Sequence, residues 1–332
     1  MRDNMIKLGI LGTGKIVQEL LPHLDQIPLA QVSLLSTEHS RERAQALVEQ
    51  YHLHAYFVDY NELLESDVNT IYVALPNHLH FAFAKQALQH GKHVICEKPM
   101  TSNVEELKTL IQIAKQNGVM LLEAMTLYHL PAYQAMRCAL ASVEPVKLVS
   151  FNYSQYSSRY DAFRQGMTPP VFDCEKSGGA LMDINVYNIH AMIGLFGKPQ
   201  RVQYHANITR GIDTSGILVC EYPDFQVVCV GAKDCASKQQ SVIEGETATI
   251  SIEGPLSCMT RFEVQHHNRT NEVYADRDAP YRMVPEFLSF VRILENADQT
   301  ACDRLMQYSL MAAEVLEEAR KSAGISFPCD KQ

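Results

Sequence analysis

The segment Gly9-Ile10-Leu11-Gly12-Thr13-Gly14-Lys15-Ile16-Val17 joins a strand-like apolar run, 6–11, to a helix-like run that begins at Lys15. Gly12 allows the tight turn between them, and Gly14 lets a pyrophosphate approach the backbone, because glycine carries no side chain. The helix that follows offers its N-terminal N–H groups and its dipole to that anion. We therefore predict a nucleotide site formed by residues 12–16, although Val17 stands where such turns have a third glycine or an alanine.

The rest of residues 5–125 repeats this alternation of short aliphatic runs and helix-like segments. Strands are expected at 6–11, 31–35, 55–58, 70–75, 93–96 and 119–123. Helices are expected at 15–24, 41–51, 77–91 (capped by Asn77) and 104–116, and the acidic segment 61–67 is expected to be a turn. This alternation is typical of βαβ units around a parallel sheet.

After Pro131 the pattern changes to strand-like runs separated by turn residues. These runs lie at 146–156, 202–209, 215–221, 225–230, 241–244 and 247–253, which predicts a mostly antiparallel sheet. Helices are expected at 132–140, 179–196, 284–295 and 303–322. We therefore divide the chain into an N-terminal α/β domain, 1–127, and a C-terminal α+β domain, 128–332.

The composition is that of a soluble globular protein of two domains, since the chain has 332 residues, of which 46% are hydrophobic and 20% charged. A formal net charge of −9 disfavours a nucleic-acid partner, because phosphate backbones attract Lys and Arg. No apolar stretch approaches the roughly 18 residues of a membrane span and no secretory signal is present, so the expected compartment is the cytoplasm. The nine cysteines are odd in number and include no Cys-x-x-Cys pair, which predicts no disulfide framework.

The ribose-binding position of a dinucleotide site lies about 20 residues beyond the glycine turn, at the end of the second strand. The sequence there is Ser36-Thr37-Glu38-His39-Ser40-Arg41. An acid such as Glu38 binds the ribose 2′-hydroxyl of NAD, whereas Ser36, Thr37 and Arg41 suit the 2′-phosphate of NADP. Arg41 also fits a solvated first helical turn, so the predicted cofactor is left as NAD(P).

Lys98, in Glu97-Lys98-Pro99, follows a buried strand-like run. The proline favours an extended conformation for the lysine, and the strand places it at the carboxyl edge of the sheet, where open α/β folds bind ligands. A lysine there stabilises charge on a substrate oxygen or takes part in acid/base catalysis. The alternative is a surface lysine beside a turn.

A second group of polar residues lies on the helix expected at 179–196, which opens at Gly178-Gly179. Asp183 and Tyr187 are four residues apart and His190 is three further on, so the three should share one helical face. They form either a substrate site or a hydrogen-bonded contact between helix and sheet. Neither this set nor His78 with His80 has the spacing of zinc ligands, so no metal is predicted.

Four segments together strongly resemble the Gfo/Idh/MocA family of oxidoreductases: the glycine turn, Ala74-Leu75-Pro76-Asn77-His78-Leu79-His80, residues 91–99, and the stretch from Gly178 to Tyr187. The resemblance implies an N-terminal Rossmann domain and a C-terminal α+β domain with a large open sheet that is often used for oligomer contacts. It also implies hydride transfer between NAD(P) and a sugar, polyol or related alcohol. Asp-x-x-x-Tyr and Glu123-Ala124-Met125 look most like the glucose-fructose oxidoreductase and dimeric dihydrodiol dehydrogenase branch.

The resemblance also implies a role for individual residues. Lys98, Asp183 and Tyr187 match catalytic positions, with Tyr187 as the proton donor to the substrate oxygen and Lys98 assisting it. His190 is added as a substrate contact because of the helical face it is expected to share with Asp183 and Tyr187. Leu75, Pro76, Asn77, His80, Glu97 and Lys98 would line the nicotinamide and its ribose, which adds them to the cofactor set of Gly12, Thr13, Gly14, Lys15, Ile16, Ser36, Thr37, Glu38 and Arg41.

Two functions from different classes follow from these observations. The first is an NAD(P)-dependent dehydrogenase or reductase of a small carbohydrate-like substrate, assembled as a homodimer or larger homo-oligomer. The alternative is a non-catalytic nucleotide or sugar sensor on the same fold, because a fold does not determine a function. Lys98, Asp183 and Tyr187 favour the enzyme, since a sensor needs no proton donor. A hydrolase or metal enzyme is disfavoured because the chain has no Gly-x-Ser-x-Gly or His-Glu-x-x-His segment.

Overall fold

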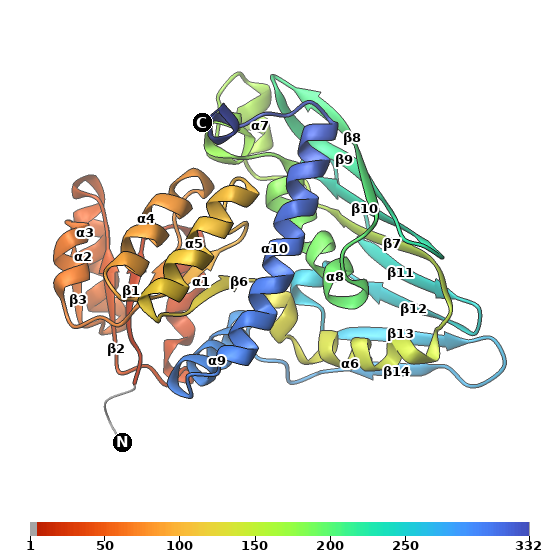
Figure 1. Ribbon diagram of the computed structural model, residues 1–332, viewed down its shortest axis with the longest axis horizontal. Coiled ribbons are helices and arrows are strands. Elements are labelled where there is room, and N and C mark those ends of the chain that lie inside the picture. The colour runs from red at the N-terminus through yellow and green to blue at the C-terminus, as the bar shows by residue number, and fades with distance from the viewer. Residues whose placement is uncertain (1–4, 332) are drawn as a thin grey trace. The chain divides into compact units, whose positions relative to one another are not determined.

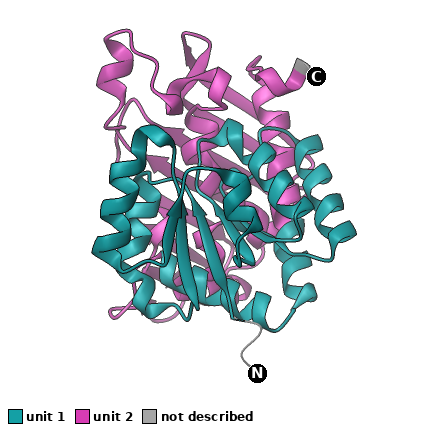
Figure 2. Ribbon diagram, turned by 90° about the vertical axis from the view of Figure 1, so that its left-hand side faces the viewer, with its two compact units in different colours: residues 1–124, 283–307 teal, residues 125–282, 308–332 magenta. Residues whose placement is uncertain are grey.

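The chain forms two compact units, which Figure 2 distinguishes by colour. The structure is a computed structural model that describes residues 5–331. Unit 1 comprises Met1–Ala124 with Met283–Gln307, and unit 2 comprises Met125–Arg282 with Tyr308–Gln332. Packing therefore assigns residues 283–307 to the N-terminal unit, whereas the sequence analysis included them in the second domain.

Unit 1 contains a six-stranded sheet in the order β3-β2-β1-β4-β5-β6 (Figure 1). All neighbouring strands pair in parallel, which confirms the predicted Rossmann sheet. The chain order reverses between β1 and β4, and open α/β sheets bind ligands in the crevice at such a point, beyond the carboxyl ends of the strands. The strands are β1 (Lys7–Leu11), β2 (Gln31–Leu35), β3 (Ala55–Phe57), β4 (Thr70–Val73), β5 (His93–Glu97) and β6 (Leu121–Ala124).

The helices that connect these strands are α1 (Lys15–Leu20), α2 (Arg41–Tyr51), α3 (Tyr60–Glu65), α4 (Asn77–Gln89) and α5 (Val104–Asn117). Helix α3 replaces the turn expected at 61–67. The Asp59 carboxylate accepts hydrogen bonds from the N–H groups of Asn61 (2.7 Å) and Glu62 (3.4 Å), and this cap stabilises a short helix there. The expectation that Asn77 caps its helix is also wrong by one residue, because extended Pro76 is the cap and Asn77 is already helical.

Helix α9 (Met283–Glu295) and the first turns of α10 (Gln299–Ser322) complete unit 1. The Phe287 ring meets the Tyr72 ring of β4 edge to face, with the ring centroids 5.2 Å apart. Cys302 Sγ donates a hydrogen bond to Leu121 O of β6 at 3.4 Å. Because β6 is an edge strand, this contact occupies a backbone carbonyl that would otherwise lack a partner strand.

Unit 2 is built on an eight-stranded sheet in the order β14-β13-β12-β11-β7-β10-β9-β8. Among the described strands only β7 and β10 pair in parallel, so the prediction of a mostly antiparallel sheet is confirmed. The sequence analysis missed β13, whose outward positions are polar or charged, and β14, whose side chains are mostly exposed. The strands are β7 (Val146–Ser154), β8 (Arg201–Thr209), β9 (Ile212–Glu221), β10 (Gln226–Ala232), β11 (Gln240–Gly245), β12 (Ala248–Glu253), β13 (Arg261–His266) and β14 (Glu272–Ala275).

Helices α6 (Pro131–Ala139) and α8 (Val186–Phe196) and the later turns of α10 lie against one face of this sheet (Figure 1). Buried Val149 and Phe151 of β7 point to that face, as the alternation of a half-covered strand requires. The opposite face carries apolar side chains with large exposed fractions, 52% for Leu148 and 46% for Ile217. A short helix that was not predicted, α7 (Tyr160–Arg164), lies in the long connection between β7 and α8.

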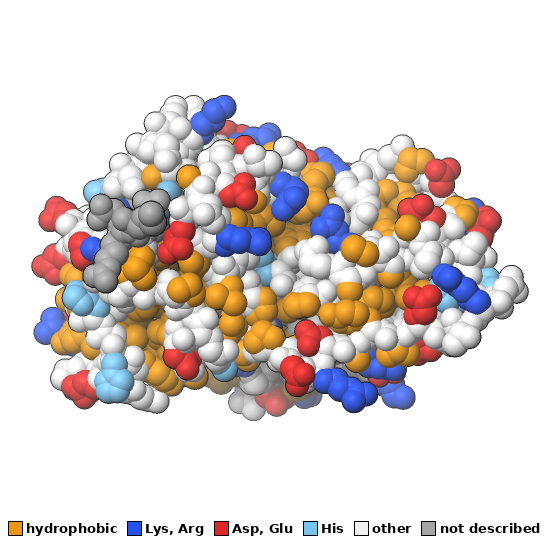
Figure 3. Space-filling view, turned by 90° about the horizontal axis from the view of Figure 1, so that it is seen from below, with side chains coloured by type: hydrophobic (Ala, Val, Ile, Leu, Met, Phe, Trp, Pro, Cys, Tyr) orange, Lys and Arg blue, Asp and Glu red, His pale blue; other side chains and the backbone are white. Residues whose placement is uncertain are grey.

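Charged side chains of both signs are interspersed on the face of the molecule that Figure 3 draws. On the face drawn in Figure 3, Lys and Arg lie between Asp and Glu, and the described residues there form no continuous basic patch. Of the helices described, none combines the length and apolar character needed to span a bilayer.

Candidate active site

The predicted cofactor residues of unit 1 all follow the carboxyl ends of four strands, so the parallel sheet brings them to one edge. Residues 12–16 follow β1, residues 36–41 follow β2, residues 75–80 follow β4, and Lys98 follows β5, whose last residue is Glu97. Because β1 and β4 are neighbours at the point of reversal, the glycine turn and residues 75–77 lie beside each other.

Gly12 and Gly14 are required for different reasons. Gly12 has φ +105°, and a Cβ there would lie 2.9 Å from Ala74 O, so both the backbone conformation and the available space exclude a side chain. Gly14 has an ordinary φ of −72°, and a Cβ there would meet no atom within 4 Å. Packing therefore explains Gly12, whereas Gly14 leaves the open backbone that a pyrophosphate needs. The residues present fit a bound dinucleotide.

The ribose-binding position after β2 contains a buried serine and an exposed ion pair. Ser36 is buried, and its N–H donates to Phe57 O at 2.9 Å. Arg41 Nη2 lies 2.9 Å from Glu38 Oε2, with both side chains at least half exposed. Such a pair contributes little stability, so either partner is available to a ligand. A 2′-phosphate would take the guanidinium, whereas a 2′-hydroxyl would take the carboxylate.

His80 joins the loop after β4 to the loop after β5. Its ring is fully buried, with Nε2 2.7 Å from Leu75 O and Nδ1 3.0 Å from Pro99 O. Burial lowers the pKa of His80, while the two carbonyl oxygens oppose that effect. A ring with no exposed surface is better explained as holding these two loops in place than as the cofactor contact that the resemblance implies.

The backbone on both sides of Lys98 is fixed by buried or partly buried acids. Glu97 Oε1 accepts a hydrogen bond from the Tyr72 hydroxyl at 2.5 Å, and Glu123 Oε1 accepts one from Met100 N at 3.0 Å. The Lys98–Pro99 peptide bond is cis, and Lys98 itself is half-buried. The sequence analysis quoted Glu123 only as part of a motif, because nothing in the sequence shows that β6 places its carboxylate against the loop after β5.

In unit 2, Asp183 and Tyr187 are the two accessible residues of an otherwise buried helical segment. Every other residue from Ala180 to Gly194 is buried, while these two are half-buried. The segment begins as a π-helical turn, Leu181–Asn185, and continues as α8, where one regular helix was predicted. Single π turns inside helices often mark functional sites. The structure therefore gives Asp183 and Tyr187 one shared accessible patch.

Asp213, which the sequence analysis did not select, supports the start of this segment. Its buried carboxylate accepts hydrogen bonds from Leu181 N at 2.6 Å and from the Tyr204 hydroxyl at 2.8 Å. Burial raises the pKa of Asp213, and these hydrogen bonds, together with the charge of Lys233, oppose the rise. Gly179 has φ +105°, and a Cβ there would lie 2.1 Å from Asp213 Oδ1, so only glycine fits.

His190 does not share the accessible patch of Asp183 and Tyr187, contrary to the expected common face. The exposed fraction of His190 is 1%, and the Tyr128 hydroxyl lies 3.0 Å from its Nδ1 and donates to its backbone O at 2.9 Å. The position three residues after Tyr187 points into the interior of unit 2 because α8 is buried on nearly all sides. A direct substrate contact by His190 stays a prediction.

Lys233, immediately after β10, forms an ion pair with Asp183. The exposed fraction of its side chain is 2%, against 31% for Asp183. The sequence analysis missed this residue because Lys233-Asp234 at a strand end is typical of a solvated turn. Only the three-dimensional packing shows that the ammonium is buried beneath the accessible carboxylate.

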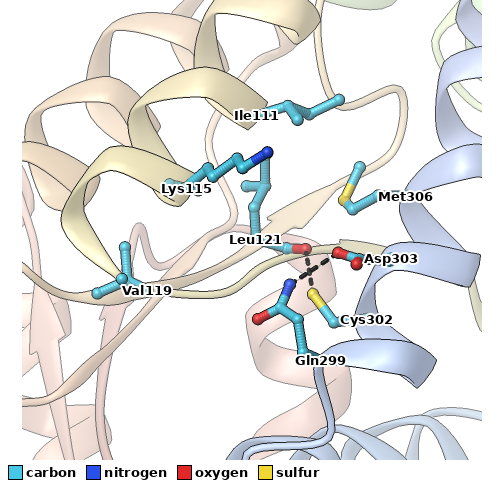
Figure 4. A pocket seen from close by; sticks show the side chains of 10 residues that line it. Ile111, Lys115, Val119, Leu121, Gln299, Cys302, Asp303 and Met306 are labelled. Atoms are coloured by element: carbon cyan, nitrogen blue, oxygen red, sulfur yellow. Dashed lines mark hydrogen bonds between the residues drawn. The ribbon is translucent and has the colours of Figure 1, made fainter.

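A cavity of about 380 Å³ lies elsewhere in unit 1, between α5, the start of β6 and α10 (Figure 4). In it, Gln299 Nε2 donates to Asp303 Oδ1 at 2.7 Å, and Cys302 donates to Leu121 O. The cavity opens beside the amino end of β6, whereas the glycine turn and Lys98 follow carboxyl ends. It is therefore separate from the candidate active site. Among the described residues, no group of three or more His, Cys, Asp or Glu is placed to hold a metal ion.

Comparison with known proteins gives matches along nearly the whole chain. Residues 6–125 match the model of the GFO_IDH_MocA oxidoreductase family with an NAD-binding Rossmann fold, and residues 133–251 match the GFO/IDH/MocA C-terminal domain. The chain is 35% identical to scyllo-inositol 2-dehydrogenase (NADP(+)) IolU of Bacillus subtilis (strain 168), over 98% of this chain and 100% of that protein. It is 30% identical to D-xylose 1-dehydrogenase (NADP(+)) 2 of Haloferax volcanii, over 96% and 99%.

Solved structures show the same architecture. KijD10, a 3-ketoreductase from Actinomadura kijaniata in complex with NADP and TDP-benzene, superposes with a TM-score of 0.83 at 21% identity, covering 96% of this chain and 98% of that one. Levoglucosan dehydrogenase in complex with NADH and levoglucosan gives 0.79 at 16% identity, covering 96% and 97%. At these identities the likeness shows the fold, and the sequence matches show the relationship. The protein belongs to the Gfo/Idh/MocA family of oxidoreductases and has the NAD-binding Rossmann fold of that family.

Proposed function

We propose that the protein is an NADP-dependent dehydrogenase of a sugar or polyol, with a cyclic polyol as the first substrate to test. The observation that carries this proposal is the pair Asp183 and Tyr187, the accessible acid and phenol of a segment that is otherwise wholly buried. The full-length similarity to an inositol dehydrogenase and to a xylose dehydrogenase, both named for NADP(+), supports the substrate class and the cofactor.

Oxidation of an alcohol removes a hydride from carbon and a proton from oxygen. A bound nicotinamide supplies the hydride acceptor, and the residues of this chain handle the proton and the charge on oxygen. We assign the proton transfer to Tyr187, whose phenolate would take the proton in oxidation and whose phenol would donate it in reduction. We assign to the Lys98 ammonium the stabilisation of negative charge on the reacting oxygen. The Asp183 carboxylate would accept a hydrogen bond from a substrate hydroxyl and so orient the substrate.

A turnover assay separates the proposed enzyme from a sensor on the same fold. The purified protein is incubated with NADP+ and, in turn, scyllo-inositol, myo-inositol, D-xylose and a dihydrodiol, and the nicotinamide absorbance is followed. We expect reduction of NADP+ with at least one polyol or sugar. The sensor would be favoured if the protein binds NADPH tightly but catalyses neither the reduction of NADP+ by any of these alcohols nor the oxidation of NADPH by the matching ketones.

Cofactor preference is expected to depend on the two residues paired at the end of β2. Fluorescence titration should show tighter binding of NADPH than of NADH. Arg41→Ala should weaken NADPH binding by about tenfold and leave NADH binding nearly unchanged, because a charge-assisted contact with phosphate is lost. Glu38→Ala is the matched control and should not weaken NADPH binding. Preference for NADH in the wild type, lost in Glu38→Ala, would show that Glu38 binds a ribose hydroxyl and that the cofactor is NAD.

We also propose that two copies of the chain associate through the open face of the eight-stranded sheet. This face carries exposed Leu148 and Ile217, and half-buried Val219, Val228 and Val242 lie on three of its strands. Sedimentation should therefore give at least twice the chain mass of 37.4 kDa. Ile217→Glu should shift the protein toward the monomer, whereas Leu288→Glu, at another exposed leucine, should not. A wild type that sediments only as a monomer would refute the association.

We infer that the enzyme works in the cytoplasm, because its nine cysteines are all free thiols, as a reducing compartment maintains them.

A further inference from the structure

Backbone hydrogen bonds fix the position of Lys233. Its N–H donates to Thr214 O at 2.9 Å, and its carbonyl accepts from Ser157 N at 2.9 Å. These bonds connect it to the start of β9 and to the connection that follows β7. The base of the side chain is therefore fixed.

The buried ammonium of Lys233 contacts groups of different chemistry. It forms an ion pair with Asp183 Oδ2, its Nζ lies 3.4 Å from Val171 O, and the same atom is 4.9 Å from the centroid of the Phe172 ring. A lysine is almost never fully buried unless it is paired. The desolvation penalty of its ammonium is larger than the attraction of a distant opposite charge. Asp183 is the partner that carries the opposite charge, with buried Asp213 as a second acid in its field.

The two members of this pair differ in access to solvent. Lys233 has 2% of its side chain exposed and Asp183 has 31%, so the cation lies beneath a carboxylate that reaches the surface. The buried pair between Arg320 and Asp330 in the same unit is closed on both sides, with exposed fractions of 1% and 12%. A pair that only stabilises the fold has no need of an accessible carboxylate. This difference in exposure indicates that Lys233 holds a carboxylate that is itself accessible to a ligand.

We propose that Lys233 is a positioning residue for the substrate site, acting through Asp183. Its ammonium holds the Asp183 carboxylate in one orientation, ready to accept a hydrogen bond from a substrate hydroxyl. Through Val171 and Phe172 it also fixes the connection before α8 against the same carboxylate. This inference rests on the proposed function, because it assigns Asp183 to the substrate.

The test is a mutant cycle in the full-length protein, with kcat, KM and the Kd for NADPH measured for each variant. Lys233→Met should lower kcat/KM for the polyol by about 30-fold or more with a Kd for NADPH within about twofold of the wild type, because the Rossmann unit is untouched. Lys233→Arg, which keeps the charge, should recover most of the loss. The double variant Lys233→Met/Asp183→Asn should be no less active than Asp183→Asn alone, since both changes remove one interaction.

Arg320→Met is the matched control for a structural effect. It removes the buried cation of the Arg320–Asp330 ion pair and should lower Tm, while kcat/KM per folded molecule stays within about twofold of the wild type. If Lys233→Met does not fold, Lys233→Gln replaces it, because glutamine retains a donor without the charge. Wild-type kcat/KM in the folded Lys233 variant, or losses that multiply independently in the double variant, would overturn the inference.

Failure of the proposed function has a different signature. A wild type that binds NADPH but oxidises no polyol contradicts the proposed function, and the Tm values of the same four proteins then decide the pairing. Tm losses in Lys233→Met and Asp183→Asn that do not add in the double variant retain Lys233 as the partner that positions Asp183. Tm losses that add in the double variant would refute the pairing of Lys233 with Asp183.

Discussion

Replacement of Lys98 by methionine is expected to lower kcat by about a hundredfold to ten-thousandfold, because the ammonium that stabilises charge on the reacting oxygen is lost. Methionine has a side chain of similar length, so the volume at the end of β5 changes little. The Kd for NADPH should stay within about threefold of the wild type, since the residues proposed to bind the pyrophosphate and the adenosine ribose follow β1 and β2. Steady-state kinetics and a fluorescence titration measure the two quantities.

Lys92 provides a matched control at the opposite end of the same strand. It precedes β5, and its Nζ donates to Val68 O at 2.6 Å, on the amino edge of the sheet. Lys92→Met should lower Tm slightly and leave kcat within about twofold of the wild type. Equal losses of kcat in the two variants, or an unchanged kcat in Lys98→Met, would remove Lys98 from the reaction.

Replacement of Tyr187 by phenylalanine is expected to lower kcat by about a hundredfold or more, because the hydroxyl that exchanges the proton with the substrate oxygen is removed. The ring remains, so the packing of α8 and the contact with the Tyr153 ring, at a centroid distance of 5.7 Å, are retained. Tm should therefore stay close to that of the wild type. Kinetics with the polyol that gives turnover, together with thermal unfolding, provide the measurement.

Tyr153→Phe removes the hydroxyl of the neighbouring aromatic ring and is the control for this variant. We expect it to keep kcat within about threefold of the wild type, because its hydroxyl is not assigned to the proton transfer. A larger loss of kcat in Tyr153→Phe than in Tyr187→Phe would indicate that Tyr153 is the proton donor, which contradicts the role assigned to Tyr187.

Most of the fold was predictable because its signals are local and periodic. The six strands of unit 1 are short aliphatic runs bounded by turns, and their alternation with helices allows one parallel arrangement. The failures have local causes as well. Asp59 converts an expected turn into helix α3 by capping it, and β14 escapes detection because its side chains are mostly exposed and so show little alternation. The placement of 283–307 with unit 1 depends on contacts such as Phe287 on Tyr72, which no sequence window contains.

The candidate site was predictable where residues follow strand ends or lie four apart on a helix. The topology of a parallel sheet gathers residues 12–16, 36–41, 75–80 and Lys98 at one edge whatever their distance in sequence. Lys233, Asp213 and Glu123 could not be found in this way, since each acts on a segment that is at least 23 residues away. The expectation that His190 shares an accessible face with Asp183 and Tyr187 is wrong for the converse reason, because the helix is buried on nearly every side and periodicity alone does not show which face is open.

Transfer of deuterium from substrate carbon to the cofactor tests the central claim most directly. A polyol that supports turnover is labelled with deuterium on the carbon that bears the reacting hydroxyl, and the NADPH formed is analysed by mass spectrometry and NMR. We predict that the label arrives on C4 of the nicotinamide and that Lys98→Met forms this product far more slowly. NADPH that carries only solvent hydrogen, or no NADPH with any polyol or sugar, would contradict hydride transfer by this protein.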